Sequence, residues 1–264
     1  MPFKLAVAQL SAVRADKDAN LEKMAGAMAE AASAGARAIL FPELSITGYV
    51  LTEEVRAMAE MAAGPSLQRL GELARQHDMV TVCGWPEASD EGLVYDSAAV
   101  IERDGSLLNV YRKTHLWGKE ADVFSAGDRL LAFDTSLGRI GVAICYDMEF
   151  PETARLLALD GARMVLSLTA TTDPFAPYQA VYTRARAMEN SIYVATANTV
   201  GDLDGRHFFG ESSIVGADGD VIRMAGRQDQ ILVGEIELAS PHPAADRLEY
   251  LKKRRPELYR GLTH

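Results

Sequence analysis

Three side chains with the chemistry for acyl transfer each follow a stretch of sequence that predicts a strand. Cys145 ends the apolar run GRIGVAIC, Glu43 follows ARAILFP, and Lys113 ends LLNVYRK. A thiolate is a nucleophile, a carboxylate can take up the thiol proton, and an ammonium can neutralise an oxyanion. Because sites form at the carboxyl ends of strands in open α/β sheets, we expect the three side chains to converge there.

Each of these residues, taken alone, also has a purely structural interpretation. Cys145 can be a small buried hydrophobic residue, Glu43 a surface carboxylate and Lys113 a solvated lysine. His115 is an alternative general base, although a loop histidine more often holds structural hydrogen bonds. Cys83 lies in mid-strand in VTVCGW, and we interpret it as a core residue.

Two features can stabilise a Cys145 thiolate. Pro151 stands at the favoured first position of a predicted helix, whose free N–H groups carry partial positive charge. A cation must supply the rest, and the backbone N–H of Tyr146 is the expected second donor to an oxyanion. The acidic neighbours are expected to fix the turn and to complement the helix start: Asp147, Glu149 and Glu152.

Strands and helices alternate along the chain, with hairpins between them. Helical periodicity or boundary residues predict helices at 17–34, 65–77, 151–160 and 178–190, and a basic amphipathic helix in DRLEYLKKRRPELY up to Pro256. Turns at Asp104-Gly105 and Asp218-Gly219 predict two hairpins. The predicted strands are FKLAVAQL, ARAILFPE, MVTVCGW, GRIGVAICYD, ARMVLSL, SIYVATAN and QILVGEIEL.

A short internal repeat suggests two similar halves. GARAIL at Gly35 and GARMVL at Gly161 occur in matching strand–helix–strand contexts. The strands are apolar enough to be buried on both faces, so each sheet needs cover on both sides. We therefore predict an α/β fold: a four-layer α-β-β-α sandwich of two β-sheets with pseudo-twofold halves, forming a single domain over 1–264.

Composition narrows the classes of function. The net charge of −10 argues against nucleic acid or an anionic membrane as a partner, because both require a basic face. No apolar run approaches the roughly 20 residues that span a bilayer, and the start of the chain does not resemble a signal peptide. Two cysteines make no disulfide framework, so a cytoplasmic location is expected. No metal-ligand spacing or phosphate-binding loop is visible, so we expect no cofactor.

Three segments in order, FPELSITGY, YRKTHLWG and AICYDMEFPE, resemble the signature blocks of the nitrilase superfamily, the carbon–nitrogen hydrolases. The resemblance extends from KLAVAQL to YLKKRRPELY. It implies that Glu43 is the general base, Lys113 the oxyanion stabiliser and Cys145 the nucleophile. A second glutamate, Glu120, would position substrate or carry protons, with Asp122 in the same loop as its competitor. The implied reaction hydrolyses a small amide through a thioester, with water as the second substrate and no metal.

The resemblance leaves several activities open. An amidase acting on small carboxamides is favoured, because Tyr146 rather than a tryptophan follows Cys145. A nitrilase, an ω-amidase, an N-carbamoyl hydrolase, a non-catalytic binding or scaffold member and a redox-sensing thiol protein remain alternatives. Arg184 or Arg186 is a candidate for binding a substrate carboxylate, or else belongs to a solvated or interface face. The residues expected to line the substrate pocket are Tyr49, Trp117, Met148, Ala170, Thr171, Phe175 and Tyr178.

Members of this superfamily usually pair through helices. A homodimer or a larger homo-oligomer is therefore expected. The helices after Pro151 and around 178–190 are the predicted contact surfaces, together with the tail at about 243–264.

Overall fold

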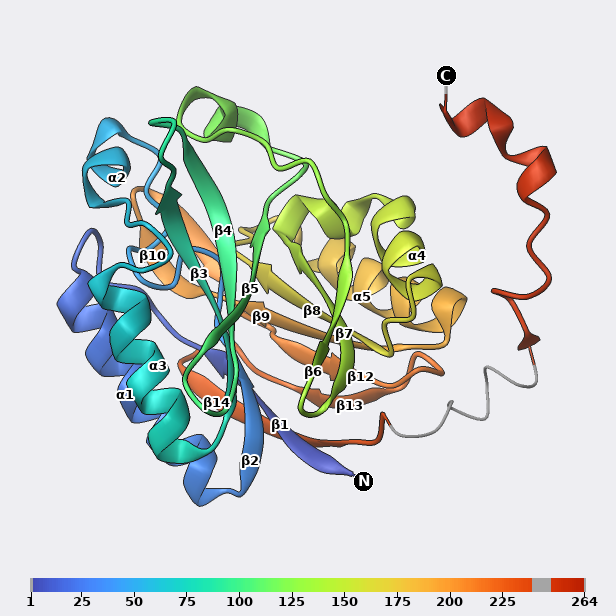
Figure 1. The fold of residues 1–264 in the computed structure, drawn as a ribbon, viewed down its shortest axis with the longest axis horizontal. Helices are drawn as coiled ribbons and strands as arrows, with labels where there is room; N and C mark the ends of the chain where they lie inside the picture. The colour runs from blue at the N-terminus through green and yellow to red at the C-terminus, as the bar shows by residue number, and fades with distance from the viewer. Residues whose placement is uncertain (1, 239–247, 264) are drawn as a thin grey trace.

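Two six-stranded sheets face each other in the computed structural model, which describes residues 2–238 and 248–263 (Figure 1). The first sheet has the order β14-β1-β2-β3-β4-β5. Its strands are β1 (Phe3–Gln9), β2 (Ala36–Leu40), β3 (Val80–Ala88), β4 (Val94–Ile101), β5 (Leu107–Arg112) and β14 (Gln230–Ile236). The second sheet has the order β13-β12-β9-β8-β7-β6. Its strands are β6 (Ala132–Thr135), β7 (Gly138–Ile144), β8 (Met164–Thr169), β9 (Tyr193–Asn198), β12 (Ser213–Val215) and β13 (Val221–Met224).

The two sheets repeat one pattern of pairing, which confirms the predicted pseudo-twofold relation. In the first sheet β1, β2 and β3 are parallel, and antiparallel strands flank them. In the second sheet β7, β8 and β9 are parallel and are flanked in the same way. The near-identical segments GARAIL and GARMVL lead into β2 and β8, which occupy equivalent places in the two sheets.

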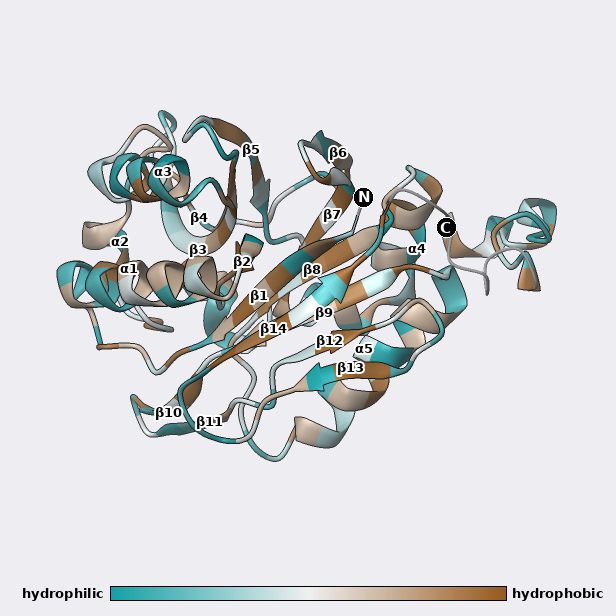
Figure 2. Cartoon of the chain, turned by 90° about the horizontal axis from the view of Figure 1, so that it is seen from below, coloured by the Kyte–Doolittle hydropathy of each residue, from teal (hydrophilic) through white to brown (hydrophobic). Residues whose placement is uncertain are grey.

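Helices cover the outer face of each sheet, so the molecule has the predicted α-β-β-α layers (Figure 2). The helices are α1 (Lys17–Ser33), α2 (Glu53–Met58), α3 (Pro65–His77), α4 (Pro151–Leu159) and α5 (Ala176–Asn190). α1 and α3 pack on the first sheet, and α4 and α5 on the second. Alternation along β7 shows how the strand serves two layers: Ile140, Val142 and Ile144 enter the core between the sheets, and Ala143 packs under α4 and α5.

The topology brings several strand ends together. Because β5 runs parallel to β2 and β3, their carboxyl ends lie at one edge of the first sheet. The hydroxyl of Tyr111 on β5 donates to Asp147 just beyond β7, and Thr199 after β9 donates to the carbonyl of Leu10 after β1. The carboxyl ends of strands from both sheets therefore meet at one place.

Some predicted elements differ from those observed. The chain leaves β2 at Leu40, two residues before Pro42, and leaves β7 at Ile144. A short hairpin that we did not predict, β10 (Val200–Leu203) with β11 (Arg206–Phe209), lies near the strand ends. The predicted tail helix begins within residues 239–247, outside the described residues. Beyond them the tail forms turns and two 3-10 helices after Arg255, namely η3 (Pro256–Leu258) and η4 (Arg260–Thr263). No helix in the described ranges is long and apolar enough to cross a membrane.

Candidate active site

Cys145 occupies a sharp turn directly after β7. Its φ of 47° lies in the left-handed region, which a non-glycine residue rarely adopts and which occurs often at functional sites. Cys145 also begins η2 (Cys145–Glu149), a 3-10 turn, and α4 begins only at Pro151. The helix expected to activate the thiol therefore begins at Pro151, as predicted, but η2 separates it from Cys145. The free N–H groups that adjoin Cys145 are those that open η2.

Asp147 anchors this turn, as its position predicted. Its buried carboxylate accepts hydrogen bonds from the N–H groups of Ile144 and His115 and from the hydroxyls of Tyr111 and Thr114. Burial alone would raise the pKa of Asp147, but these hydrogen bonds outweigh it and lower the pKa below its usual value. Asp147 thus joins the Cys145 turn to the loop that follows Lys113.

His115 shares this structural role. Its Nδ1 lies 2.9 Å from Asp147 Oδ1, and its ring stacks on Phe150 with centroids 4.1 Å apart. The alternative of His115 as the general base therefore has no geometric support.

We expect Asp147→Ala to lower the free energy of unfolding by about 3 kcal/mol or more. Several donors that now bind one buried, charged acceptor would lose their hydrogen-bond partner. Denaturant unfolding measures the loss. Asp134→Ala removes an exposed carboxylate that pairs with Arg139 and is the matched control. Equal stability of the two variants would contradict the anchoring role.

Glu43 reaches the site because the chain leaves β2 and crosses the backbone of β3. A side chain at Gly84 would meet the backbone N of Leu44 at 2.4 Å, so only glycine permits this close approach. Leu44, which follows Glu43 in the chain, has a φ of 47°, and this helps the loop to turn inward. The Glu43 side chain is consequently fully buried instead of lying on the surface.

Lys113, directly after β5, links two buried carboxylates: Glu43, in the loop after β2, and Glu120, in the 3-10 helix η1 (Gly118–Asp122). Its Nζ donates to Glu43 Oε1 at 2.5 Å and to Glu120 Oε1 at 2.7 Å. Glu120 also accepts from the hydroxyl of Tyr49 at 2.6 Å and from the backbone N–H of Trp117 at 2.8 Å. Asp122, its competitor in the sequence, is exposed.

The charges of this cluster are strongly coupled. Burial alone would lower the pKa of Lys113, but Glu43 and Glu120 outweigh it, so the pKa lies well above its usual value and Lys113 stays an ammonium. For Glu43, burial and the charge of Glu120 raise the pKa more than Lys113 lowers it, and the net shift is upward. A carboxylate with a raised pKa can take up a proton more readily near neutral pH.

The Cys145 thiol is held as a thiol, not as a ready-made thiolate. Burial and the charges of Glu43 and Glu120 raise its pKa more than Lys113 lowers it. Its Sγ lies 3.6 Å from the hydroxyl of Thr171. The net shift favours the resting thiol despite the stabilising charge of Lys113, so the reaction needs a base to remove the thiol proton.

A metal ion is the other group that these carboxylates could hold. Oxygen atoms of Glu43, Asp96 and Glu120 lie within 4.8 Å of one another. The ammonium of Lys113 lies among them, at 3.7 Å from Asp96 Oδ2 and closer to the two glutamates. The ammonium of Lys113 already supplies the positive charge between these carboxylates. The arrangement therefore fits a lysine-centred ionic cluster better than a metal site.

A small pocket of about 70 Å³ opens beside Cys145. Tyr49, Trp117, Ala170, Thr171 and Phe175, all expected to bind substrate, line it. So do Tyr146, Glu149, Thr172 and Arg206.

Two of the predicted pocket residues lie elsewhere. Met148 packs in the core beneath α4 and α5, because the 3-10 turn after Cys145 directs it inward. Tyr178 contacts Phe175 at a centroid distance of 5.9 Å but is not a lining residue.

The two arginines proposed to bind a substrate carboxylate also lie outside the pocket. Arg186 is buried and donates to the carbonyls of Met148 and Glu149, and Arg184 donates to the carbonyl of Gly219. Arg206 at the start of β11 takes that place, with its guanidinium 5.7 Å from the ring centroid of Tyr49. Nothing in the sequence pointed to Arg206, because the β10–β11 hairpin was not predicted.

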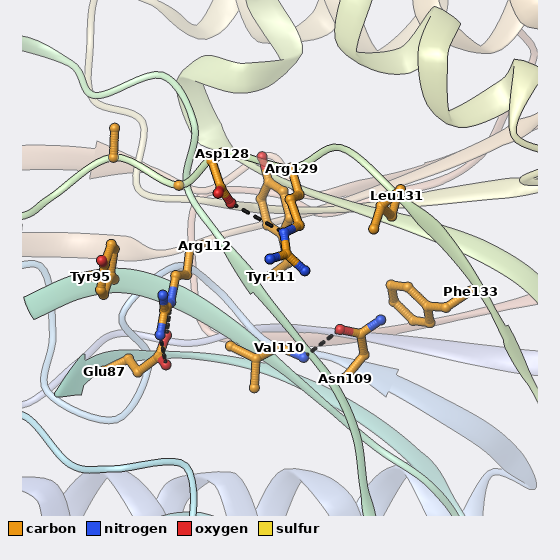
Figure 3. Close-up of a pocket in the computed structure, with 12 residues that line it drawn as sticks. Glu87, Tyr95, Asn109, Val110, Tyr111, Arg112, Asp128, Arg129, Leu131 and Phe133 are labelled. Atoms are coloured by element: carbon orange, nitrogen blue, oxygen red, sulfur yellow. Dashed lines mark hydrogen bonds and ion pairs between the residues drawn. The ribbon is translucent and has the colours of Figure 1, made fainter. Parts of the chain in front are cut away.

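A larger groove of about 410 Å³ lies between β5 and the segment before β6 (Figure 3). Arg112 and Glu87 pair with two hydrogen bonds on the sheet side of this groove, and Arg112 also lies 3.9 Å from the ring centroid of Tyr95. Neither Cys145 nor the buried cluster around Lys113 lines this groove. The smaller pocket beside Cys145 is therefore the candidate active site.

Besides Arg206, two further residues of the site were not identified from the sequence. Asp96 is a carboxyl within the fully buried strand VYDSAAVI, and an acidic residue in such a strand was the available sign. Asn198 ends β9; its side chain accepts from the N–H of Thr171 and donates to that residue's carbonyl, which fixes the pocket wall.

The carbon-nitrogen hydrolase family model matches residues 4–245. The chain is 36% identical to an (R)-stereoselective amidase of Pseudomonas sp over 254 residues, which cover 96% of this chain and 92% of the relative. It is 33% identical to an omega-amidase of Mus musculus over 270 residues, with 97% and 96% coverage.

Solved structures of an amidase from Nesterenkonia sp. AN1 have the same fold. A glutamate-to-glutamine variant with acrylamide added to its active-site cysteine gives a TM-score of 0.88 at 30% identity, covering 98% of this chain and 99% of the other. A cysteine-to-alanine variant in complex with butyramide gives 0.88 at 30% identity, with 98% and 96% coverage.

Proposed function

Since this chain belongs to the carbon–nitrogen hydrolase family, we propose that it hydrolyses a small carboxamide to the carboxylic acid and ammonia at Cys145. The supporting observation is the buried Glu43–Lys113–Glu120 cluster, next to a half-buried thiol that opens onto a small pocket. Purified enzyme offered amides, ω-amides, carbamoyl amino acids and nitriles should release ammonia most rapidly from an amide. Release from nitriles alone, or from none, would overturn the proposal.

In the first half-reaction the thiol attacks the amide carbon. Glu43 takes the proton of Cys145 as the S–C bond forms, because the raised pKa of the thiol requires a base. The oxyanion is stabilised by the ammonium of Lys113 and the N–H of Tyr146. Glu43 then gives its proton to the leaving nitrogen, the C–N bond breaks and ammonia departs.

In the second half-reaction water cleaves the thioester. Glu43 takes a proton from water, the hydroxide attacks the carbonyl, and the C–S bond breaks. The thiolate that leaves recovers the proton from Glu43. Glu120 holds Lys113 and Tyr49 in place throughout, so it acts as the second carboxylate that the family resemblance implied.

An ω-amide, which carries a carboxylate at its other end, is the second candidate substrate. Arg206 favours it, because this pocket cation forms no ion pair within the described part of the chain. Glu149 lies in the same pocket and would repel a carboxylate that approached it. The position of the negative group on the substrate therefore decides which of the two charges it meets.

We expect Arg206→Gln to lower kcat/KM for an ω-amide by about 10-fold or more, the effect of losing one charge-assisted hydrogen bond. An uncharged amide of the same length should lose little. Arg223→Gln, which changes an exposed arginine of β13, is the control. Equal losses on both substrates would remove the ω-amide candidate.

We also propose that the chain is a single domain that works as a homodimer or larger homo-oligomer in the cytoplasm. Two free thiols, Cys83 and Cys145, support a reducing compartment. The outer faces of α4 and α5 support pairing, because they expose large apolar side chains: Leu156, Leu159, Tyr178, Val181 and Met188.

Val181→Glu should convert the oligomer to a monomer, because Val181 is 63% exposed and a charge in an apolar contact is costly. Light scattering after size-exclusion chromatography measures the mass. Leu93→Glu places the same charge at an exposed apolar site in the turn between β3 and β4 and should leave the mass unchanged. A wild-type monomer would refute the oligomer directly.

A further inference from the structure

Asp96 is a buried carboxyl that the mechanism above does not use. It lies on β4 opposite Pro86 of β3, at the edge where Glu43 and Lys113 meet, and its side chain has no exposed surface. The backbone carbonyl of Asp96 accepts from the N–H of Lys113 at 2.9 Å, so the residue is fixed next to the cluster. The ionisable groups that interact with it are Glu43, Lys113 and Glu120, and Tyr49 and Cys145 complete the cluster.

Three carboxyl oxygens of the cluster lack a hydrogen-bond donor. Both side-chain oxygens of Asp96 and Oε2 of Glu43 are buried and find no donor among the described residues. Lys113 Nζ is 3.7 Å from Asp96 Oδ2, too long for a hydrogen bond, and it is already engaged by Glu43 and Glu120. Buried oxygens without a donor are rare in native structures.

A proton on Asp96 accounts for two of these three atoms, one Asp96 oxygen and Glu43 Oε2. We infer that Asp96 is a neutral carboxylic acid whose O–H donates to Glu43 Oε2, so that Asp96 is a positioning residue for the general base. Each carboxyl then has a partner: Glu43 Oε1 accepts from Lys113, and Glu43 Oε2 accepts from Asp96. This inference rests on the proposed role of Glu43.

The electrostatics of the cluster agree with this geometry. Ionised Glu43 and Glu120 already outnumber the single cation Lys113, and a third buried anion would meet both of them. Burial, and then the charge of Glu43, raise the pKa of Asp96 well above its usual value. The same hydrogen bond lowers the pKa of Glu43 and opposes the effect of burial there.

The consequence for catalysis is a base that is ionised and held in one orientation. Asp96 keeps its proton throughout the cycle and transfers none, so the proton from Cys145 still passes to Glu43 and on to ammonia. Without the Asp96 hydrogen bond, the pKa of Glu43 would rise further, and the base would be protonated over more of the neutral range.

The pH profile of kcat/KM tests the sign of this effect. Asp96→Ala removes the donor and should move the acid limb upward by about one pH unit. Asp96→Asn keeps an N–H donor and should leave the limb within about half a unit of wild type. An ionised Asp96 would give the opposite sign, with both variants moving the limb downward. A structural role alone would lower kcat with the limb unmoved; either outcome overturns the inference.

Infrared spectroscopy tests the proton directly and does not depend on Asp96→Ala folding. The carbonyl stretch of a buried carboxylic acid should be present at neutral pH, vanish in Asp96→Asn and persist in Glu87→Gln, which changes a buried carboxylate on β3 paired with Arg112. Glu43→Gln should shift this band, because its hydrogen-bond acceptor changes from an anion to an amide. Absence of the band, or a band indifferent to Glu43→Gln, would overturn the inference.

Failure of the proposed function would look different. If Glu43 were not the base, Glu43→Gln would retain turnover while the infrared band of Asp96 remained and still responded to that substitution.

Discussion

Cys145→Ala should lower amide turnover by about 10⁴-fold or more, to the background of the assay, because the thiol forms the covalent intermediate on which both half-reactions depend. The rest of the site should survive. Alanine retains the β-carbon at the same positive φ, and the substitution removes the 3.6 Å interaction between Sγ and the hydroxyl of Thr171. We therefore expect the free energy of unfolding to stay within about 1 kcal/mol of wild type.

The second cysteine provides the matched control. Cys83 is fully buried against α1 and α3, and burial raises the pKa of its thiol to about 12. Cys83→Ala should lose some stability and keep kcat/KM. Iodoacetamide followed by mass spectrometry should label Cys145, which lines the pocket, and leave Cys83 unmodified. Ammonia release that persists in Cys145→Ala would refute the thioester mechanism.

The alternatives of another class give distinct results in the same experiment. A binding or scaffold protein would show no ammonia release in wild type or in Cys145→Ala. A redox sensor would also release no ammonia from amides, but its Cys145 thiol would be modified by oxidants. The membership in the carbon–nitrogen hydrolase family and the buried ionic cluster both favour the enzyme.

Strand-end positions carried most of what the sequence could predict about the site. Glu43, Lys113 and Cys145 each follow a clear strand pattern, and parallel strands bring their carboxyl ends to one edge. The fold followed from similar reasoning, because apolar strands covered on both faces require a layered sandwich. Periodicity is a local property, and these inferences needed only local patterns.

Side-chain direction within turns could not be predicted in the same way. Met148 stands close to Cys145 in the sequence, as a pocket residue would, but the 3-10 turn that follows the strained Cys145 directs it into the core. Arg186 falls on a helix face with no evident partner in the sequence, yet the neighbouring turn supplies carbonyls that bind it. Asp96 was overlooked because its role depends on Glu43, which lies in the loop after β2 and 53 positions earlier in the chain, a separation that no periodic pattern records.

Glu43→Gln should leave the fold intact and cut the acylation rate by at least about 10²-fold, the usual scale for loss of a general base. Glutamine has nearly the same shape, and its amide oxygen can still accept from Lys113, which also keeps Glu120 as an ionic partner. Single-turnover measurement of acyl-enzyme formation isolates the affected step, and the unfolding midpoint reports the fold. Glu91→Gln, at an exposed turn before β4, is the control for the substitution itself.

The size of this loss depends on whether another carboxyl can replace Glu43. Glu120 is engaged by Lys113, Tyr49 and the N–H of Trp117, so it is held as an acceptor and cannot turn toward the thiol without breaking these contacts. Asp96 already carries a proton and has no capacity for a second. Near-wild-type acylation in Glu43→Gln would contradict the base assignment, and a larger loss in Glu120→Gln than in Glu43→Gln would transfer that role to Glu120.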